Sequence, residues 1–218
     1  MPKQVDYESR RRRIAEAVCL LADEHGPEGV SMRDVAARAQ VSLGAVQRCF
    51  RTKGEMLLFA VGHVGDRVTE RVRARLAAHP DGSPASALGH AADELALLRE
   101  EHRAEARIWL AFVAQAAVSE PLTGPLRSSY TALQALLVRL VSEATGSGSG
   151  SADGGVAPPD PGHEARALLA LADGLTTHVL IGHLTAQEAA GTLHAHLLSL
   201  YARAGTPARP SSRTTPSP

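Results

Sequence analysis

A glutamine and an arginine stand side by side in a short segment that could read the edges of nucleic-acid bases. The apolar residues Val46 and Phe50 are four positions apart, so a helix places them on one face. Gln47 and Arg48 lie between them and turn outward. Arginine pairs well with a guanine edge and glutamine with an adenine edge. We expect this helix, over 42–50, to enter a DNA major groove. Its outward face consists of Leu43, Gly44, Gln47 and Arg48.

Positive charge gathers around this segment, although the chain as a whole is neutral. The chain has 23 Lys and Arg against 23 Asp and Glu. Residues 1–53 contain ten of the basic and seven of the acidic residues, a net charge of +3, and residues 54–218 carry the compensating −3. This distribution favours a polyanion, double-stranded DNA, at the N-terminal end only. The residues predicted to hold its phosphates are Arg33, Ser42 and Lys53.

Two other groups, ten histidines and a glycine-rich stretch, are expected to have no metal-binding or catalytic role. His178 and His183 are five residues apart, which does not place them on one face of a helix as metal ligands require. His194 and His196, two apart, fail in the same way. The stretch 146–162 follows a predicted helix and contains neither GxGxxG nor GxSxG. We expect no metal, no cofactor and no enzymatic activity.

The two cysteines, Cys19 and Cys49, form no CxxC pair and cannot build a disulfide framework. A reducing compartment is the simpler interpretation, and no signal peptide is recognisable. The longest uncharged runs, 174–187 and 189–202, have 14 residues each, too few to span a bilayer. We expect a cytoplasmic protein that uses no membrane. Because Cys49 lies near the basic segment, a redox-sensing role for its thiol stays open as an alternative.

The N-terminal end of the chain is predicted to hold a flexible arm and one amphipathic helix. Residues 1–9 are polar and form the arm. Apolar residues recur at helical spacing over 10–24. Gly26 suits a left-handed helix end and Pro27 prevents continuation.

Three further helices follow, and their spacing is that of a helix-turn-helix leading into a long helix. Their N-cap candidates are Ser31, Ser42 and Thr52. Gln40 occupies the turn, where the backbone is often left-handed and a residue other than glycine costs roughly 1 kcal/mol. The long helix, over 55–78, keeps one face apolar.

The rest of the chain is also predicted to be helical, which makes the fold class all-α. Composition marks 146–162 as a flexible loop and 204–218 as a disordered tail. A helix-turn-helix domain over 10–54 would then be joined by the long helix to a ligand-binding and dimerisation domain over 55–203. The helices predicted in that domain after the long one cover 83–99, 103–118, 122–144, 163–182 and 185–203.

The stretch 14–58 resembles the DNA-binding domain of the TetR family of transcriptional regulators. The resemblance rests on IAEAVCLLADEHG, on SMRDVAARA followed after one residue by VS, and on an exit motif. The exit motif is formed by Phe50, Lys53, Met56 and Leu57. The chain departs from the family pattern at Gln40 in place of glycine, Gln47 in place of tyrosine, and Cys49 in place of a bulky polar residue.

This resemblance implies a regulator that binds operator DNA and responds to a small, partly apolar molecule. The segment 108–116 and the last two helices resemble the betaine-regulator-type branch of the family. In similar proteins the central helices enclose the ligand pocket. The residues expected to line it here are Phe59, His63, His102, Trp109, Phe112, Gln115 and Tyr130.

The last two predicted helices leave more apolar surface than one subunit can cover, which predicts a homodimer. The residues assigned to the interface are Leu168, Leu171, Leu175, Val179, Leu193, Leu197, Leu200 and Tyr201. We expect a repressor on a near-palindromic operator, released when a ligand tilts the helix 55–78. A helical dimer without a DNA function is the alternative from another class of protein.

Overall fold

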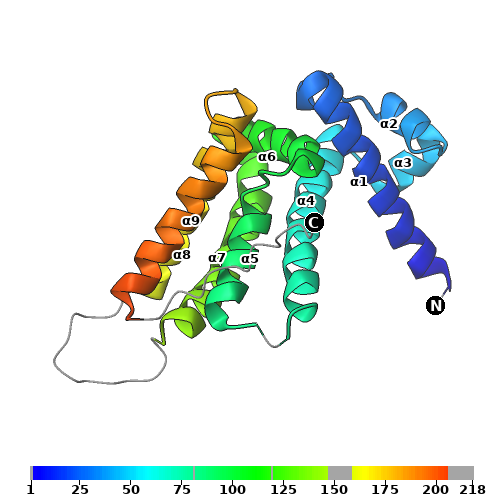
Figure 1. The fold of residues 1–218 in the computed structure, drawn as a ribbon. Coiled ribbons are helices and arrows are strands. Elements are labelled where there is room, and N and C mark those ends of the chain that lie inside the picture. Colours follow the sequence, from blue (N-terminus) through cyan, green and yellow to red (C-terminus); the bar gives the residue numbers. More distant parts are fainter. Residues whose placement is uncertain (1, 81, 119, 147–158, 206–218) are drawn as a thin grey trace, which may run out of the picture.

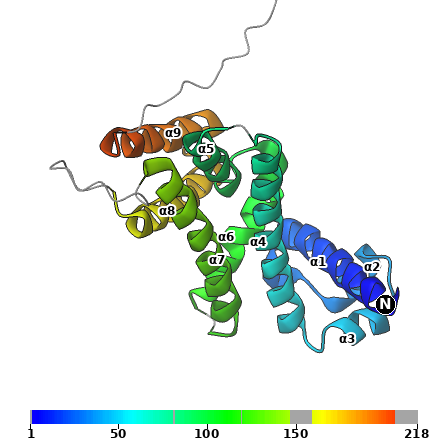
Figure 2. The same ribbon diagram turned by 90° about the horizontal axis from the view of Figure 1, so that it is seen from below.

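The computed structural model describes residues 2–80, 82–118, 120–146 and 159–205. These residues form helices and turns but no strand, which confirms the all-α prediction. In chain order the helices are α1 (Pro2–Gly29), α2 (Met32–Arg38), α3 (Leu43–Cys49), α4 (Lys53–Ala77), α5 (Pro84–Leu95), the 3₁₀ turn η1 (Glu100–His102), α6 (Arg103–Ala116), α7 (Glu120–Thr145), α8 (Pro161–Leu180) and α9 (Ala186–Arg203). Helices α1–α3 lie at one end of the molecule and α8 and α9 at the other, with α4 between them (Figures 1 and 2).

Helix α1 begins at Pro2, so most of the segment predicted as a flexible arm is helical instead. An ion pair of 2.7 Å between Arg10 and Asp6, one turn apart, supports this extension. At the other end, Gly26 has a left-handed φ of 73°, as the Gly26–Pro27 pair predicted. The chain then makes one further helical turn before α2.

The short helices α2 and α3 and the long helix α4 begin where the sequence predicted. Ser31, Ser42 and Thr52 each accept a hydrogen bond from the backbone N–H three residues on, at 3.2, 3.1 and 3.0 Å. These bonds satisfy donors that a helix start leaves free. Gln40 has a φ of 54°, the left-handed turn conformation expected for a helix-turn-helix.

Helix α5 ends earlier than the sequence predicted. Leu97 has a left-handed φ of 48° although it is a branched residue and 6% exposed. This turn stops the helix at Leu95, and η1 leads from it into α6. Helix α8 begins at Pro161, inside the predicted loop, with Asp160 as its N-cap. The remainder of that loop, 147–158, and the tail 206–218 lie outside the described residues.

Two clusters of buried apolar side chains form the core, and the long helix α4 contributes to both. The first joins α1–α3 and the start of α4 to Ile108, Trp109 and Phe112 of α6. The second joins the later part of α4 to α5, α7, α8 and α9. The helix-turn-helix therefore packs directly on α6 as well as being attached through α4. None of the helices in the described part of the chain has the length and apolarity that a bilayer crossing requires.

Candidate functional site

Helix α3 presents two polar side chains, Gln47 and Arg48, that have no partner among the residues the structure describes. Val46 is fully buried, whereas Gln47 and Arg48 are exposed. Leu43 and Gly44, at the start of the helix, are half-buried. Neither the side chain of Gln47 nor that of Arg48 forms a hydrogen bond or ion pair with any part of the chain that the structure describes. The face predicted to read bases is therefore open to a ligand.

The residues predicted to hold phosphates have different environments. Arg33 on α2 and Ser42 at the start of α3 are exposed. Lys53, in contrast, donates from Nζ to the carbonyl oxygen of Glu28 at 2.7 Å. Carbonyl groups at the end of a helix lack partners and attract a cation. Lys53 therefore joins the start of α4 to the end of α1, so its main contact in this structure is within the subunit.

Two arginines of α1, Arg11 and Arg13, use their guanidinium groups for contacts within the DNA-binding end of the chain. The guanidinium of Arg11 lies 4.1 Å from the ring centroid of Phe59 and 5.0 Å from that of Phe50, a cation–π arrangement. Arg13 donates to the carbonyl oxygen of Ala39 at 2.9 Å. Helix α1 thereby fixes the turn that aims α3.

The thiol of Cys49 is buried, with 4% of the residue exposed. Burial raises the pKa of this thiol, and burial also raises the pKa of Cys19 to about 12. Because oxidation proceeds through the thiolate, both environments favour an unreactive thiol. The geometry gives the redox-sensing alternative no support.

A small cavity of about 20 Å³ lies in the body of the subunit, between α4, α6, α7 and α8. Helix α4 contributes Gly65 and Val68 to its wall. The rings of Trp109 and Tyr130 meet edge to face there, with centroids 5.3 Å apart and an interplanar angle of 62°. Both donate to the carboxylate of Asp173, Trp109 from Nε1 at 3.3 Å and Tyr130 from its hydroxyl.

Asp173 was not predicted as a site residue. It is the one acid within the apolar run from Ala167 to Leu180, and that isolation is the signal that could have found it. Burial raises the pKa of its carboxyl group, against the lowering effect of the hydrogen bonds from Tyr130 and Trp109.

Only Trp109 and Tyr130 of the residues predicted for the ligand pocket line this cavity. Phe59 packs on Phe50, with ring centroids 5.3 Å apart. Phe112 is 1% exposed in the core shared with the helix-turn-helix. Residues of a helix point in directions set by its 3.6-residue period, and the face of α4 at the cavity is not the one that carries Phe59. The assignment of Phe59 and Phe112 to a ligand pocket stays a prediction.

The three polar residues predicted for the pocket also lie elsewhere. His102 is buried, and its Nε2 lies 3.9 Å from Oε2 of Glu94. The side-chain amide of Gln115 donates to the carboxylate of Glu28, which links α6 to the end of α1. His63 is half-buried, and burial lowers the pKa of its imidazole. These side chains do not line the small cavity, and their assignment to a ligand pocket stays a prediction.

A buried ion-pair cluster ties α4 to α5. Glu94 is 2% exposed. Its carboxylate oxygens lie 2.8 Å from Nη1 of Arg75, 3.1 Å from Nη2 of Arg99 and 3.2 Å from Nε of Arg71. Burial acts to raise the pKa of Glu94, but the hydrogen bond from Arg75 and the charges of Arg99 and His102 outweigh it and lower the pKa. The cluster resists sliding of α4 past α5.

The residues predicted for the dimer interface lie mostly inside the subunit. Six of them are at most 6% exposed: Leu168, Leu175, Leu193, Leu197, Leu200 and Tyr201. Leu171 and Val179 are half-buried. Helices α8 and α9 turn their most apolar faces toward α5 and α7, so these side chains fill the core of their own subunit. The assignment of interface residues is corrected for this reason.

The outer faces of α8 and α9 combine small residues with larger polar ones such as Arg166, His178 and His194, and two exposed apolar side chains lie on or next to them. Ile181, just after α8, is 71% exposed, and Leu198 on α9 is 39% exposed. Nothing lies within 4 Å of where a Cβ would stand on Gly174 or Gly191. These faces can therefore approach another helix closely.

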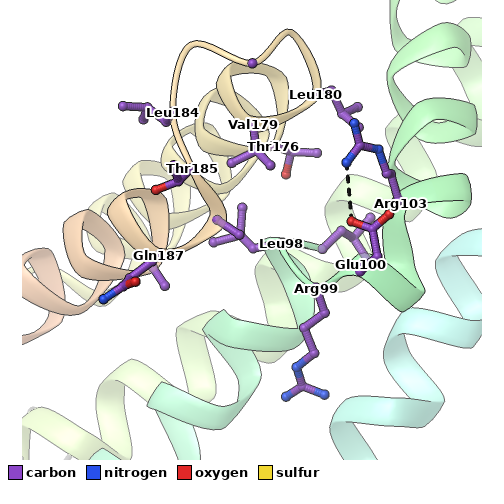
Figure 3. Close-up of a pocket in the computed structure, with 14 residues that line it drawn as sticks. Leu98, Arg99, Glu100, Arg103, Thr176, Val179, Leu180, Leu184, Thr185 and Gln187 are labelled. Atoms are coloured by element: carbon purple, nitrogen blue, oxygen red, sulfur yellow. Dashed lines mark hydrogen bonds and ion pairs between the residues drawn. The ribbon is translucent and has the colours of Figure 1, made fainter.

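A second hollow, of about 620 Å³, opens where α8 turns into α9 (Figure 3). Arg103 and Glu100 face each other at its edge, with 3.3 Å between Nη1 and Oε2. Leu97 lines both this hollow and the small cavity. Its side chain is thus part of the wall between them.

Two family descriptions match this chain. "Bacterial regulatory proteins, tetR family" matches residues 14–60, and "BetI-type transcriptional repressor, C-terminal" matches residues 84–202. The second alone covers more than half of the chain. The protein belongs to the TetR family.

Similar proteins agree with this assignment to the TetR family. The HTH-type transcriptional regulator PksA of Bacillus subtilis is 33% identical over 181 residues, which are 83% of each chain. A transcriptional regulator from Rhodococcus has a TM-score of 0.72 at 30% identity, covering 88% of this chain and 96% of its own. A regulator from Saccharomonospora viridis, solved in complex with choline, has the same fold, with a TM-score of 0.72 at 22% identity over 88% of this chain and 96% of its own. The chain is thus a transcriptional regulator with a DNA-binding helix-turn-helix.

Proposed function

We propose that this TetR-family regulator is a repressor that binds a near-palindromic operator as a homodimer. The observation that carries the proposal is the polar face of α3, where the side chains of Gln47 and Arg48 are exposed and have no partner among the described residues. The match to a BetI-type repressor description supports the direction of control. Two copies of α3 would enter successive major grooves, which requires a separation of about 34–36 Å.

The proposed dimer uses the outer faces of α8 and α9. Their small residues allow close packing of four helices, and Ile181 and Leu198 supply apolar side chains that a monomer leaves in water. A two-fold arrangement brings the same patch of each subunit together. It also leaves both copies of α1–α3 at the far end from this interface (Figure 1).

The proposed release begins at the cavity beside Trp109, where a small, partly apolar molecule binds. Because α4 contributes Gly65 and Val68 to that wall, a ligand that enlarges the cavity displaces α4. Helix α6 carries the displacement by a second route, since Arg107 pairs with Asp23 of α1 at 3.1 Å. A tenfold loss of operator affinity needs about 1.4 kcal/mol of coupling.

Fluorescence anisotropy with labelled duplexes from the DNA flanking the protein's own gene tests the proposal. The full chain should bind one of these duplexes with an affinity that falls steeply with salt. The double variant Gln47→Ala, Arg48→Ala should lose the preference for that duplex over a scrambled one. The variant Arg139→Ala removes a charge from another exposed position, on α7, and should bind like the wild type.

The alternative, a helical dimer without a DNA function, makes the opposite forecast. It expects no duplex preference at any salt concentration and no difference between the two variants. A reporter gene placed downstream of the bound duplex shows the direction of control. If the protein is a repressor, deleting its gene raises expression of the reporter.

A further inference from the structure

Two histidines from different parts of the chain, His79 and His90, bring their rings together where α4 ends beside α5. The ring centroids lie 4.9 Å apart, with an interplanar angle of 49°. His79 directly follows Ala78, the C-cap residue of α4, and His90 lies in the middle of α5. The expectation that the chain binds no metal rested on other histidine pairs, and it does not cover this one.

The distance between the two rings fits two imidazoles bound to one metal ion. A metal ion lies about 2.0–2.1 Å from a ligating imidazole nitrogen, and therefore about 3.2 Å from the centre of that ring. Ligand–metal–ligand angles of about 90–109°, from square-planar to tetrahedral, then place the two ring centres about 4.5–5.2 Å apart. The observed 4.9 Å lies inside this range.

A hydrogen bond already orients the ring of His79. Its Nδ1 lies 3.0 Å from the carbonyl oxygen of Arg75. Because a carbonyl oxygen only accepts, Nδ1 carries the proton and Nε2 carries the lone pair of the neutral ring. Metal-ligating histidines characteristically donate their other ring nitrogen to such an oxygen, which fixes the tautomer and the direction of the ring. Capping of α4 would explain His79 alone, whereas it gives no reason for His90.

The charged groups around the pair are compatible with a bound cation. Burial is the largest cause that lowers the pKa of His90, and the charges of Arg75 and His79 add to it. The imidazole of His90 is therefore neutral near pH 7, which is the form that binds a metal. Arg75 is itself paired with Glu94 at 2.8 Å, and the charge of Asp93, one turn after His90, favours a cation.

We propose that His79 and His90 bind a divalent transition-metal ion that joins the end of α4 to α5. Imidazole nitrogens suit Cu²⁺, Ni²⁺ and Zn²⁺, whereas Mg²⁺ and Ca²⁺ prefer oxygen ligands. Among the described residues no third side chain of a ligating type completes a group with them, so water occupies the remaining positions and the ion exchanges with solution. The ion acts on α4, the helix that connects the DNA-binding end to the body. Metal binding at this site is independent of the proposed repressor function.

A second pair, His178 and His183, has the same distance of 4.9 Å between ring centroids. These rings meet, contrary to the expectation from their spacing, because the chain turns back at Gly182, whose φ is 75°. Both side chains are exposed, and no hydrogen bond orients either ring within the described residues. An ion there would bridge one turn instead of two helices, so this pair serves as the comparison.

Calorimetric titration of the full chain, prepared without an affinity tag, with nickel chloride and with magnesium chloride tests the proposal. Ni²⁺ should bind and Mg²⁺ should not. Losing a residue that only supports a metal ligand costs about 10–100-fold in metal affinity. His90→Asn and His79→Asn each remove a ligand, so each should weaken the tightest Ni²⁺ site by about tenfold or more. His178→Asn and His163→Asn, at exposed positions, should leave that site unchanged.

Thermal unfolding in the presence of Ni²⁺ gives a second measurement. A ligand that binds the folded state stabilises it, so Ni²⁺ should raise the unfolding temperature of the wild type and of His178→Asn by more than that of His90→Asn. The proposal is overturned if Ni²⁺ does not bind, or if it binds the wild type and His90→Asn equally well. It is also overturned if His178→Asn removes the tightest site, because the metal then belongs to the other pair. Should His90→Asn fail to fold, His79→Asn gives the same decision.

Discussion

At the scale of single residues, the side chains proposed to contact bases differ from those that hold helix α3 in place. The side chains of Gln47 and Arg48 are exposed and have no partner in the described structure. Arg11 instead contacts the ring of Phe59, and Arg13 donates a hydrogen bond to the carbonyl oxygen of Ala39. Lys53 joins the second set through its bond to Glu28. Substitutions in the two sets should therefore fail in different ways.

Replacing Arg48 with alanine should relax base preference at one position of each half-site, at a cost of roughly 1–3 kcal/mol each. Lys53→Ala should instead lower the unfolding temperature and weaken all duplexes alike, because it frees the start of α4. Binding to a library of single-base operator variants, with thermal unfolding alongside, separates the two effects. Equal, sequence-independent losses for both variants would contradict the assignment of Arg48.

Gln40 carries backbone strain at its left-handed φ of 54°. Glycine adopts this conformation without a steric cost, so Gln40→Gly should raise the free energy of unfolding by up to about 1 kcal/mol. Chemical denaturation measures the change. Ala37→Gly, at an exposed helical position of α2, is the control and should lower stability by about 0.5–1 kcal/mol. Destabilisation by both substitutions would show that the side chain of Gln40 matters more than its backbone.

At the scale of elements, α4 is held by charges at one end and by apolar packing at the other. The charged end is the cluster around Glu94. Breaking a buried pair costs about 3–5 kcal/mol. The arginines here are partly exposed, so Glu94→Gln should lower the free energy of unfolding by about 2 kcal/mol, a value reduced for solvent screening. The exposed Glu101, which shares Arg99 at 3.5 Å, gives the control Glu101→Gln, with a loss below about 1 kcal/mol.

The same cluster predicts a dependence of stability on pH. The folded-state pKa of Glu94 is lowered from its usual 4.5, so its contribution is present above that value and is lost as pH falls through the lowered pKa. Below pH 4.5 the wild type should therefore lose stability more steeply than Glu94→Gln. Denaturation midpoints measured across this range test the sign, and parallel curves for the two proteins would contradict it.

At the scale of the whole molecule, the function proposed here needs two copies with their α3 helices at a fixed separation. An aspartate at Leu198 would place a charge in the proposed α8–α9 interface, so Leu198→Asp should shift the protein from dimer to monomer at micromolar concentration. Sedimentation velocity measures the shift. Leu20 on α1 is also exposed, at 50%, and Leu20→Asp should leave the dimer intact. A wild type that sediments as a monomer would remove the interface altogether.

The sequence by itself determined the local features of the helix-turn-helix. Caps at Ser31, Ser42 and Thr52 and the left-handed turn at Gln40 depend on residues within four positions of one another. Local hydrogen bonds and backbone sterics decide such features. The early end of α5 at Leu97 escaped prediction, because its left-handed turn contradicts the preference of leucine.

Only the tertiary structure decided which side chains meet at the cavity and which face of α8 and α9 stays outside. Trp109, Tyr130 and Asp173 lie on three different helices, and their meeting depends on how those helices rotate and cross. Periodicity identifies an apolar face but does not say whether the subunit's own core or a partner covers it. For Leu168 and Leu193 the core covers it, because α5 and α7 reach those faces first.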